Sequence, residues 1–420
     1  MKRVIALILA LAALVAVSSP AFGAVTLEVV WMGWPKNLVD KQLEDFRRAN
    51  PDISLDIQLV PFNQLFQTLE VRLASSRPPD VFIVDGPMTA SYAERGYLMP
   101  LDSHLSSKEL SAWFPASVEA CRYRGKLYTL PYATSSVGLY FNKDIFREHN
   151  VKLPPEDPGH RLTWEQVVDI ARRLTIDTDG DGQPDIWGLI IEQCDRPYQI
   201  VPLAESKGGR PLSPDGTIST GYVNSAAFVE AASFYWRLFN DWKVSPKGIL
   251  QAPIAREYFG NGKAAMMLGA EWNIAQLRHF PNYEFGLSPH PYFAAGREVT
   301  PTGGWHVGIS SKTSKKDAAL RFAKYITGHD AVATWAKLFG NAPARRDVYH
   351  SLNEMFSDLM WQVFIYEMEN TASPRPVTAG YLEYESALKE AFSAIQYGAD
   401  PAATMNNVAK QIDRELIKYR

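Results

Sequence analysis

The chain has 420 residues, of which 46% are apolar and 21% charged, and its formal net charge is −3. This length exceeds that of one ordinary domain and is enough for two lobes with separate cores. The weak acidity is spread without runs of one sign, which argues against a surface for nucleic acid or for anionic membranes.

Residues 1–23 have the three parts of a secretory signal peptide. Two basic residues precede an unbroken apolar run at 4–17, and small residues stand at 21 and 23, where signal peptidase inspects the chain. A membrane anchor is the weaker alternative, because a spanning helix needs roughly 20 apolar residues. No cysteine stands at the cleavage site to carry a lipid. We therefore expect an exported protein that starts at Ala24 and has no lipid anchor.

Strand and helix signals alternate in the first part of the mature chain. Strands are predicted at 25–31, at 53–59, where apolar and polar residues alternate, and at 81–84. Helices are predicted between them, at 38–48 and 62–75. This order of elements is typical of a parallel, doubly wound α/β sheet.

Residues 123–146 read as a crossing between two lobes. Gly125-Lys126 lies between apolar and aromatic runs, as a hairpin turn would. Pro131 interrupts the next run, a second strand resumes at 137–141, and a short helix follows at 143–149.

The rest of the chain continues the alternation of strands and helices. A capping box at 163–166 opens a helix that ends at Leu174. The other predicted elements are two short strands and two amphipathic helices: 264–268, 307–309, 315–326 and 381–395.

An ordered set of motifs resembles the landmarks of one family. The set runs PPDVFIVD, GYLMPLD, YRGKLYTLPYATSSVGLYFNKDIF, TWEQ, DTDGDGQPDIWG, FGNGKAAMMLGAEW, GGWHVGIS and RPVTAGY. It resembles the bacterial extracellular solute-binding proteins, the sugar-binding receptors of ABC importers, over essentially the whole mature chain. The resemblance implies a two-lobed periplasmic-binding-protein fold. Each lobe would be a doubly wound, mostly parallel sheet flanked by helices, and a hinge of several crossings would join the lobes.

The family layout also implies how the chain is divided. Lobe 1 would comprise residues 24–133 and 300–348, and lobe 2 residues 134–299 and 349–420, so that the chain crosses the hinge three times. The resemblance further implies a periplasmic monomer that binds a small carbohydrate and delivers it to the permease subunits of an ABC importer in the inner membrane.

Candidate sugar-binding residues follow from the chemistry of a sugar, which offers hydroxyl groups to polar side chains and an apolar face to aromatic rings. Ligands of open α/β sheets bind at the carboxyl ends of strands, which favours Trp31, Trp34 and Asp85. In the resembling maltose-binding proteins, stacking aromatic residues match Tyr198 and Trp272. The complete candidate set is Trp31, Trp34, Asp85, Tyr132, Ser135, Tyr198, Glu271, Trp272, Gly304, Trp305, Arg375 and Tyr381.

Each of these candidates has a structural alternative. The tryptophans could pack in the core, Asp85 could cap a turn, and Arg375 could pair with a carboxylate.

The tract DTDGDGQPD resembles a calcium-binding loop. Asp177, Asp179, Asp181 and Asp185 occupy loop positions one, three, five and nine. Position twelve, however, is Gly188 instead of the usual bidentate glutamate, so a plain acidic turn is the alternative. No other cofactor is expected.

Other functions and a disulfide stay open. A secreted glycoside hydrolase would also need carboxylates and aromatic residues, but the chain lacks HExxH, GxSxG and Walker A motifs, so we expect no catalytic residues. The same receptor fold could instead bind glycerol phosphate or a polyol.

The G-x-G-x-x-A pattern at 260–265 does not indicate a dinucleotide site. It follows a helix-like segment and precedes a strand, whereas such a site needs the pattern after a strand and before a helix. Export permits a disulfide, but the family layout would place Cys121 and Cys194 in opposite lobes.

Overall fold

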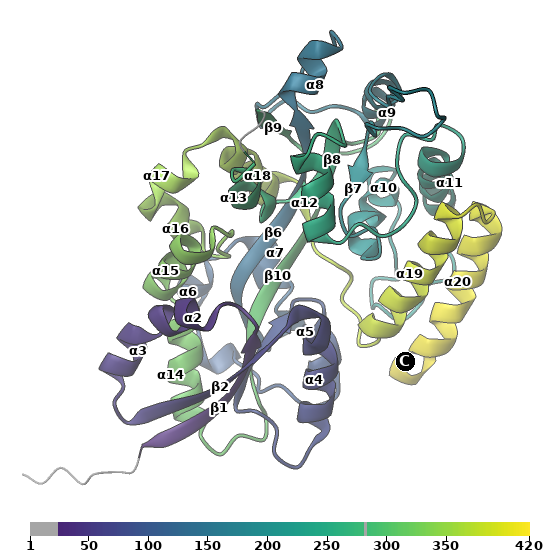
Figure 1. The fold of residues 1–420 in the computed structure, drawn as a ribbon. Coiled ribbons are helices and arrows are strands. Elements are labelled where there is room, and N and C mark those ends of the chain that lie inside the picture. Colours follow the sequence, from purple (N-terminus) through teal and green to yellow (C-terminus); the bar gives the residue numbers. More distant parts are fainter. Residues whose placement is uncertain (1–23, 281–283) are drawn as a thin grey trace, which may run out of the picture.

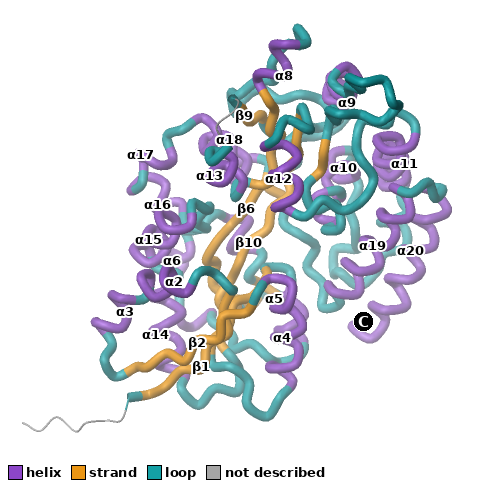
Figure 2. The backbone as a smooth tube through the Cα atoms, viewed as in Figure 1, coloured by secondary structure: helices purple, strands orange, loops and turns teal. Residues whose placement is uncertain are grey.

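The computed structural model describes residues 24–280 and 284–420, which form two lobes (Figures 1 and 2). The signal peptide predicted at 1–23 lies outside the described residues. Lobe 1 contains strands β1 (Val25–Met32), β2 (Ile53–Val60) and β3 (Val81–Asp85), and lobe 2 contains β7 (Ile190–Ile191), β8 (Met266–Ala270) and β9 (Phe285–Ser288). The two-lobed α/β fold predicted from the sequence is confirmed.

Two long strands connect the lobes. β6 (Thr129–Asn142) and β10 (Thr300–Ile309) pair with each other, β10 also pairs with β3, and β6 also pairs with β8 and β9. One sheet therefore runs through both lobes in the order β2-β1-β3-β10-β6-β8-β7, with β11 (Ala372–Ser373) beside β10. β10 is antiparallel to β3 and β6, and β6 is antiparallel to β8 and β9. β10 is parallel to β11, β1 to β2 and β3, and β7 to β8. The residue boundaries of the lobes stay a prediction.

Burial along the strands follows their place in the sheet. β3 and β6 are buried at every position, as expected of strands that are covered on both faces. β2 is an edge strand, and its burial alternates as its ISLDIQLV sequence does. Helices cover the sheet on both sides in Figure 1.

Pro131 lies inside β6, so the break that the sequence predicts at this residue is wrong. Its partner in β10 is His306, while Ala133 pairs with Trp305. Tyr132 is therefore an extra residue of β6, opposite the peptide bond that joins Trp305 to His306. A bulge of this kind accommodates a residue that has no backbone N–H within a central strand.

The hairpin turn before β6 lies one residue earlier than predicted. Arg124 and Gly125 are its central residues, with φ of 46° and 77°, and Lys126 already belongs to β5 (Lys126–Leu127), which pairs with β4 (Arg122–Tyr123). Two positive φ values indicate a type I′ turn, whose twist matches that of the flanking strands.

Most predicted helices are present with small shifts at their ends. The capping box of Thr163 and Gln166 is confirmed. The helix predicted at 38–48 is divided at Leu43, whose amide donates to two carbonyl groups. The α-helices are α2 (Lys36–Gln42), α3 (Glu44–Ala49), α4 (Phe62–Ala74), α5 (Met88–Glu94), α6 (Ser107–Leu110), α7 (Pro115–Glu119), α8 (Lys143–Glu148), α9 (Trp164–Arg173), α10 (Val201–Ser206), α11 (Ala226–Asn240), α12 (Ala252–Gly260), α13 (Asn273–Leu277), α14 (Lys316–Ile326), α15 (His329–Phe339), α16 (Arg346–Ser351), α17 (Asn353–Phe356), α18 (Leu359–Asn370), α19 (Tyr381–Gln396) and α20 (Pro401–Leu416).

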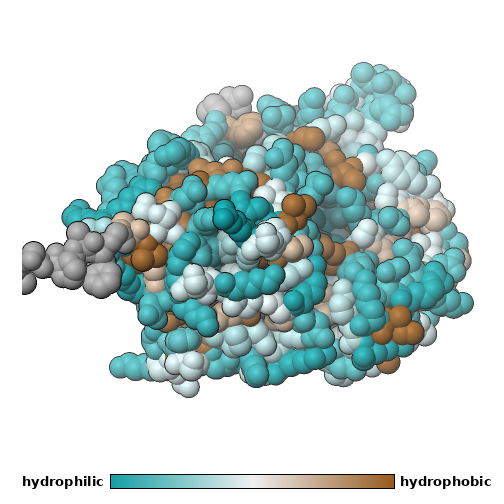
Figure 3. Space-filling view, turned by 90° about the horizontal axis from the view of Figure 1, so that it is seen from below, coloured by the Kyte–Doolittle hydropathy of each residue, from teal (hydrophilic) through white to brown (hydrophobic). Residues whose placement is uncertain are grey.

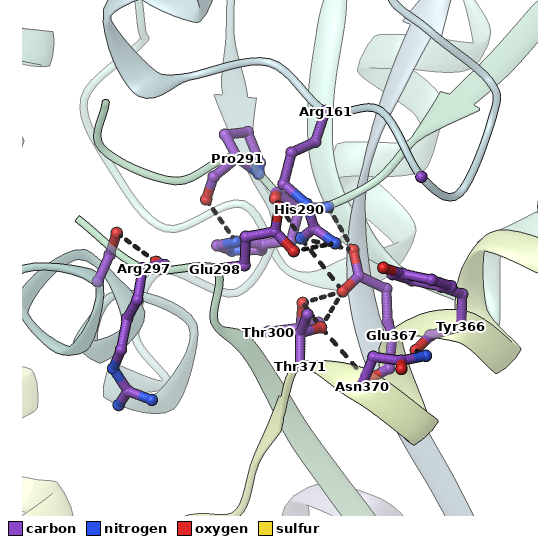
Figure 4. A network of polar contacts seen from close by, with 12 residues as sticks. Arg161, His290, Pro291, Arg297, Glu298, Thr300, Tyr366, Glu367, Asn370 and Thr371 are labelled. Carbon is purple, nitrogen blue, oxygen red and sulfur yellow. Dashed lines mark hydrogen bonds and ion pairs between the residues drawn. The ribbon is translucent and has the colours of Figure 1, made fainter. Parts of the chain in front are cut away.

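A buried polar network holds the beginnings of β10 and β11 together (Figure 4). Glu367 of α18 is fully buried, pairs with Arg161 at 3.2 Å and accepts a hydrogen bond from the His290 amide at 2.8 Å. It also accepts hydrogen bonds from the hydroxyl groups of Thr300 and Thr371. Because Thr300 begins β10 and Thr371 precedes β11, the network fixes the points from which both strands start.

The surface seen in Figure 3 is mostly hydrophilic, with apolar residues in small separate patches. Within the described residues, no helix combines the length and the apolar character needed to cross a membrane. Cys121 and Cys194 are both buried and are not joined by a disulfide.

Candidate functional site

A cavity of about 260 Å³ lies between the lobes. Two residues of lobe 1 line one side: Trp34, which follows β1, and Asp85, which ends β3. Tyr198 and Trp272 of lobe 2 line the other side. Most of the candidate residues gather here because the carboxyl ends of strands from both lobes face the same space. The candidates in the wall are Trp34, Asp85, Ser135, Tyr198, Glu271, Trp272, Gly304, Trp305 and Arg375.

Aromatic rings make up much of the wall, and neighbouring rings hold them in place. Trp34 meets Trp335 edge-on, with ring centroids 5.9 Å apart, and Phe62 meets Trp305 edge-on at 6.1 Å. Trp34, Trp272 and Trp305 are only partly buried, so part of each ring is accessible. Ring faces held in this way can stack on the apolar face of a sugar.

Asp85 forms an ion-paired cluster with two arginines across the cavity. Its Oδ2 atom lies 2.9 Å from Arg196 Nη2 and 3.0 Å from Arg375 Nη1, and Arg196 Nε is 3.1 Å from Glu385. Burial alone would raise the pKa of Asp85, but the Arg375 and Arg196 guanidinium groups hold it below its ordinary value. Asp85 is therefore an ionised carboxylate that joins the lobes.

Tyr198 packs against one of these arginines. The Arg375 guanidinium carbon is 4.3 Å from the Tyr198 ring centroid, and Tyr198 is 9% exposed. One ring face is thus used for a cation–π contact. The stacking role of Tyr198 stays a prediction, and it would use the remaining accessible part of the ring.

Glu271 offers an unpaired polar group in the wall. It is 2% exposed, and its Oε2 atom has no hydrogen-bond partner among the described residues. Burial raises the pKa of Glu271 well above its ordinary value. In its protonated form this acid can donate a hydrogen bond to a ligand oxygen.

Gly304 allows the two crossing strands to approach closely behind the wall. A Cβ atom at this position would lie 2.5 Å from the carbonyl oxygen of Ala133 in β6. Glycine is therefore required there on steric grounds.

Three candidates do not line the cavity, because they are buried behind it. Trp31 is 2% exposed and packs on Tyr132, with centroids 5.4 Å apart, and the Tyr132 hydroxyl accepts a hydrogen bond from Gln42 at 2.9 Å. Tyr381 is 2% exposed and donates to Glu385 at 3.2 Å. Each instead supports a residue of the wall, since Trp31 and Tyr132 contact Trp34, and Glu385 holds Arg196.

The sequence-based predictions missed several residues of the wall, and three of them had usable signals. Phe62 follows the strand 53–60, so the strand-end rule could have found it. Arg196 stands two positions before Tyr198 in the motif RPYQ. Met32 ends β1 and therefore carries the same strand-end signal. The other missed residues have no such signal: Ala133, Thr134, Gln193, Trp335 and Asn341.

The acidic loop brings together three of its four predicted calcium ligands. Carboxylate oxygens of Asp177, Asp179 and Asp185 lie within 4.8 Å of one another and are exposed, but Asp181 is not part of the group. A side chain at Gly188 is excluded, because a Cβ atom there would lie 2.0 Å from the Ala171 carbonyl oxygen. Calcium binding stays a prediction.

Calcium added after chelation is expected to raise the melting temperature through these three carboxylates. Asp179→Asn should abolish the rise, because it removes a charged ligand, whereas Asp181→Asn should retain it. Differential scanning fluorimetry measures both variants. A flat titration of the unaltered protein would identify the loop as an acidic turn.

A second buried acid makes stability depend on pH. Glu205 of α10 shares a small pocket with Tyr198 and Arg375 and accepts a hydrogen bond from Ser373 at 3.2 Å. Burial raises the pKa of Glu205 to about 7 from an ordinary value of 4.5. The folded state therefore binds this proton more tightly than the unfolded chain does. The contribution of this bound proton to the free energy of unfolding is complete below pH 4.5 and is lost as the pH rises through about 7.

Glu205→Gln is accordingly expected to be more stable than the unaltered protein at about pH 8, and to lose that advantage towards about pH 5. Melting temperatures across this range give the difference. Glu119→Gln is the control, because Glu119 is exposed. A pH-independent difference for Glu205→Gln would show that the carboxyl group titrates normally.

Comparisons with known proteins agree with this architecture. The family model described as "Bacterial extracellular solute-binding protein" matches residues 33–333. The chain is 25% identical over 316 residues to the maltotriose-binding protein of Pyrococcus abyssi, covering 72% of this chain and 63% of that protein. It is 22% identical over 395 residues to a maltodextrin-binding protein of Bacillus subtilis, covering 92% and 88%.

Two solved structures share the fold. One is a solute-binding protein from Thermotoga lettingae bound with α-D-tagatose, with a TM-score of 0.80, 22% identity, and coverage of 94% of this chain and 100% of that chain. The other is the maltose/maltodextrin-binding domain from Bdellovibrio bacteriovorus bound to maltotriose, with a TM-score of 0.77, 20% identity, and coverage of 94% and 99%.

Proposed function

Because the chain belongs to the bacterial extracellular solute-binding proteins, we propose that it is the receptor of an ABC-type sugar importer and binds a mono- or oligosaccharide between its lobes. The observation that carries the proposal is the composition of the cavity, in which aromatic rings and polar side chains from both lobes surround one space. This combination suits a sugar, which has apolar faces and many hydroxyl groups.

The charges of the cavity favour a neutral ligand over glycerol phosphate. Arg196 is already paired with Asp85 and Glu385, and Arg375 with Asp85. A phosphate group would have to displace a buried carboxylate to reach either guanidinium group, which would leave that carboxylate without its partner. A polyol, which is neutral, remains the second candidate ligand.

The same family membership supports a binding protein without catalytic residues. We further propose that residues 1–23 direct export to the periplasm without a lipid anchor, and that the protein acts there as a monomer. Its partners would be the permease subunits in the inner membrane. A ligand that contacts both lobes binds the closed form more tightly, and therefore shifts the population towards it. The closed form would be the state that the permease recognises.

A ligand screen with a measurement of shape tests the proposal. Maltotriose, α-D-tagatose, mannitol and glycerol 3-phosphate are compared by thermal shift, where a ligand at 100 times its Kd stabilises the native state by about 2.7 kcal/mol. We expect at least one saccharide to stabilise the protein and to reduce its radius of gyration in small-angle scattering. Stabilisation by glycerol 3-phosphate alone would refute the sugar assignment, and binding without compaction would refute the closure mechanism.

A further inference from the structure

Glu192 lies directly behind the aromatic wall, where two parallel strands end. It follows β7 (Ile190–Ile191), and Trp272 follows β8 (Met266–Ala270) after one intervening residue, so the parallel pairing of these strands brings the two side chains together. Glu192 is fully buried and is not part of the cavity wall, whereas Trp272 is. The acid is therefore placed to act on the tryptophan instead of on a ligand.

Both oxygens of Glu192 accept hydrogen bonds from this region. Oε1 accepts from the Trp272 indole Nε1 at 2.8 Å, and Oε2 accepts from the Ala270 amide at 3.0 Å and from Asn273 Nδ2 at 2.9 Å. All three partners are N–H donors, so the carboxyl group serves purely as an acceptor. Burial raises the pKa of Glu192, and these three hydrogen bonds oppose the rise.

The side chains of Glu192 and Asn273 pack tightly against the backbone of Gly269. A Cβ atom at Gly269 would lie 3.0 Å from both Glu192 Oε2 and Asn273 Nδ2, so the acid and the amide pack directly over the strand. Asn273 also donates to the Ala270 carbonyl oxygen at 3.0 Å. The turn between β8 and α13 is thus tied to Glu192 on both sides of Trp272.

The hydrogen bond to Glu192 also determines what Trp272 can offer a ligand. The indole has a single N–H donor, and Glu192 occupies it. Only the apolar faces and edges of the ring are then left for a ligand, which is the chemistry of stacking. Fixing the indole at its N–H also removes the entropy cost of ordering the ring when a ligand binds.

We propose that Glu192 is a positioning residue for saccharide binding: it fixes the Trp272 ring through the indole N–H and so sets the affinity of the cavity. This inference rests on the proposed function, because it assigns the ring a saccharide to stack on.

Glu192→Gln tests the inference with a minimal change. A glutamine has one acceptor oxygen, which can serve Ala270 and Asn273, but its NH₂ group then faces the indole N–H and the bond to Trp272 is lost. The Kd for maltotriose, measured by titration calorimetry, is expected to rise about fivefold or more. In a Trp272→Phe background, which has no N–H to hold, the same replacement should change Kd by less than about twofold.

Asp80→Asn is the matched control for general loss of stability. Asp80 is also a buried acid that accepts a backbone hydrogen bond, from the Glu28 amide at 2.8 Å, and it lies outside the cavity wall. It should lower the melting temperature without changing Kd. An equal loss of affinity for Glu192→Gln in both backgrounds, or no loss in either, would overturn the inference.

A measurement without ligand separates this inference from the proposed function. The indole N–H proton of Trp272 gives an NMR resonance that is assigned by its absence in Trp272→Phe. This proton should exchange slowly with solvent in the unaltered protein and markedly faster in Glu192→Gln. Unchanged exchange would overturn the inference even if maltotriose binds. If no saccharide binds the unaltered protein, the proposed function fails, and a saccharide-positioning role for Glu192 fails with it, whatever the exchange rates.

Discussion

Asp85→Ala is expected to lower the free energy of unfolding by about 3–5 kcal/mol, the usual cost of removing one partner of a buried ion pair. The Asp85 side chain is 5% exposed, and those of Arg375 and Arg196 are 8% and 14% exposed. Arg196 would keep its contact with Glu385, but Arg375 would lose its carboxylate partner in a site with little access to water. Urea denaturation followed by circular dichroism measures the loss.

Asp40→Ala provides the comparison. Asp40 is also one carboxylate between two cations, Lys36 at 2.5 Å and Arg47 at 2.9 Å, but its side chain is 36% exposed. Exposed pairs contribute about 0–1 kcal/mol, so this variant should be nearly as stable as the unaltered protein. Similar losses of unfolding free energy for Asp85→Ala and Asp40→Ala would show that the buried cluster stabilises the protein no more than an exposed one.

Because Asp85 joins lobe 1 to Arg196 of lobe 2, we also expect Asp85→Ala to increase the radius of gyration without ligand.

Trp272→Ala is expected to weaken saccharide binding at least tenfold, or about 1.4 kcal/mol, and to lower folding stability as well, because Glu192 Oε1 loses its indole partner. The ring is partly accessible in the cavity wall, so its removal takes away stacking area more than core packing. Titration calorimetry gives the change in affinity, and thermal denaturation gives the change in stability.

Trp242→Ala is the control for the loss of an indole as such. Trp242, like Trp272, is partly buried. It packs on Phe234, with ring centroids 5.3 Å apart, but it lies outside the cavity. It should lose stability and retain affinity. Retained affinity together with a large loss of stability in Trp272→Ala would instead mark Trp272 as a core residue.

The strands, the helices and the fold were largely predictable, because their signals lie within a few residues of one another. The alternation of residues 53–60 and the capping box of Thr163 and Gln166 are examples. Pro131 was misread for the same reason, since a local rule takes a proline as a break. The bulge that admits it depends on pairing with β10, far away in the chain.

The candidate site divides in a similar way. Local signals indicate which residues stand at strand ends, and these were enough to find Trp34 and Asp85, while Trp272 was found through the resemblance to maltose-binding proteins. Their partners come from distant parts of the chain: Asp85 pairs with arginines 111 and 290 positions away, and the Glu192 carboxyl group accepts a hydrogen bond from an indole 80 positions away. The position of Trp31 behind the wall likewise follows from the packing of the folded chain. Such contacts depend on how strands from two lobes meet in space, and no local pattern of residues records that meeting.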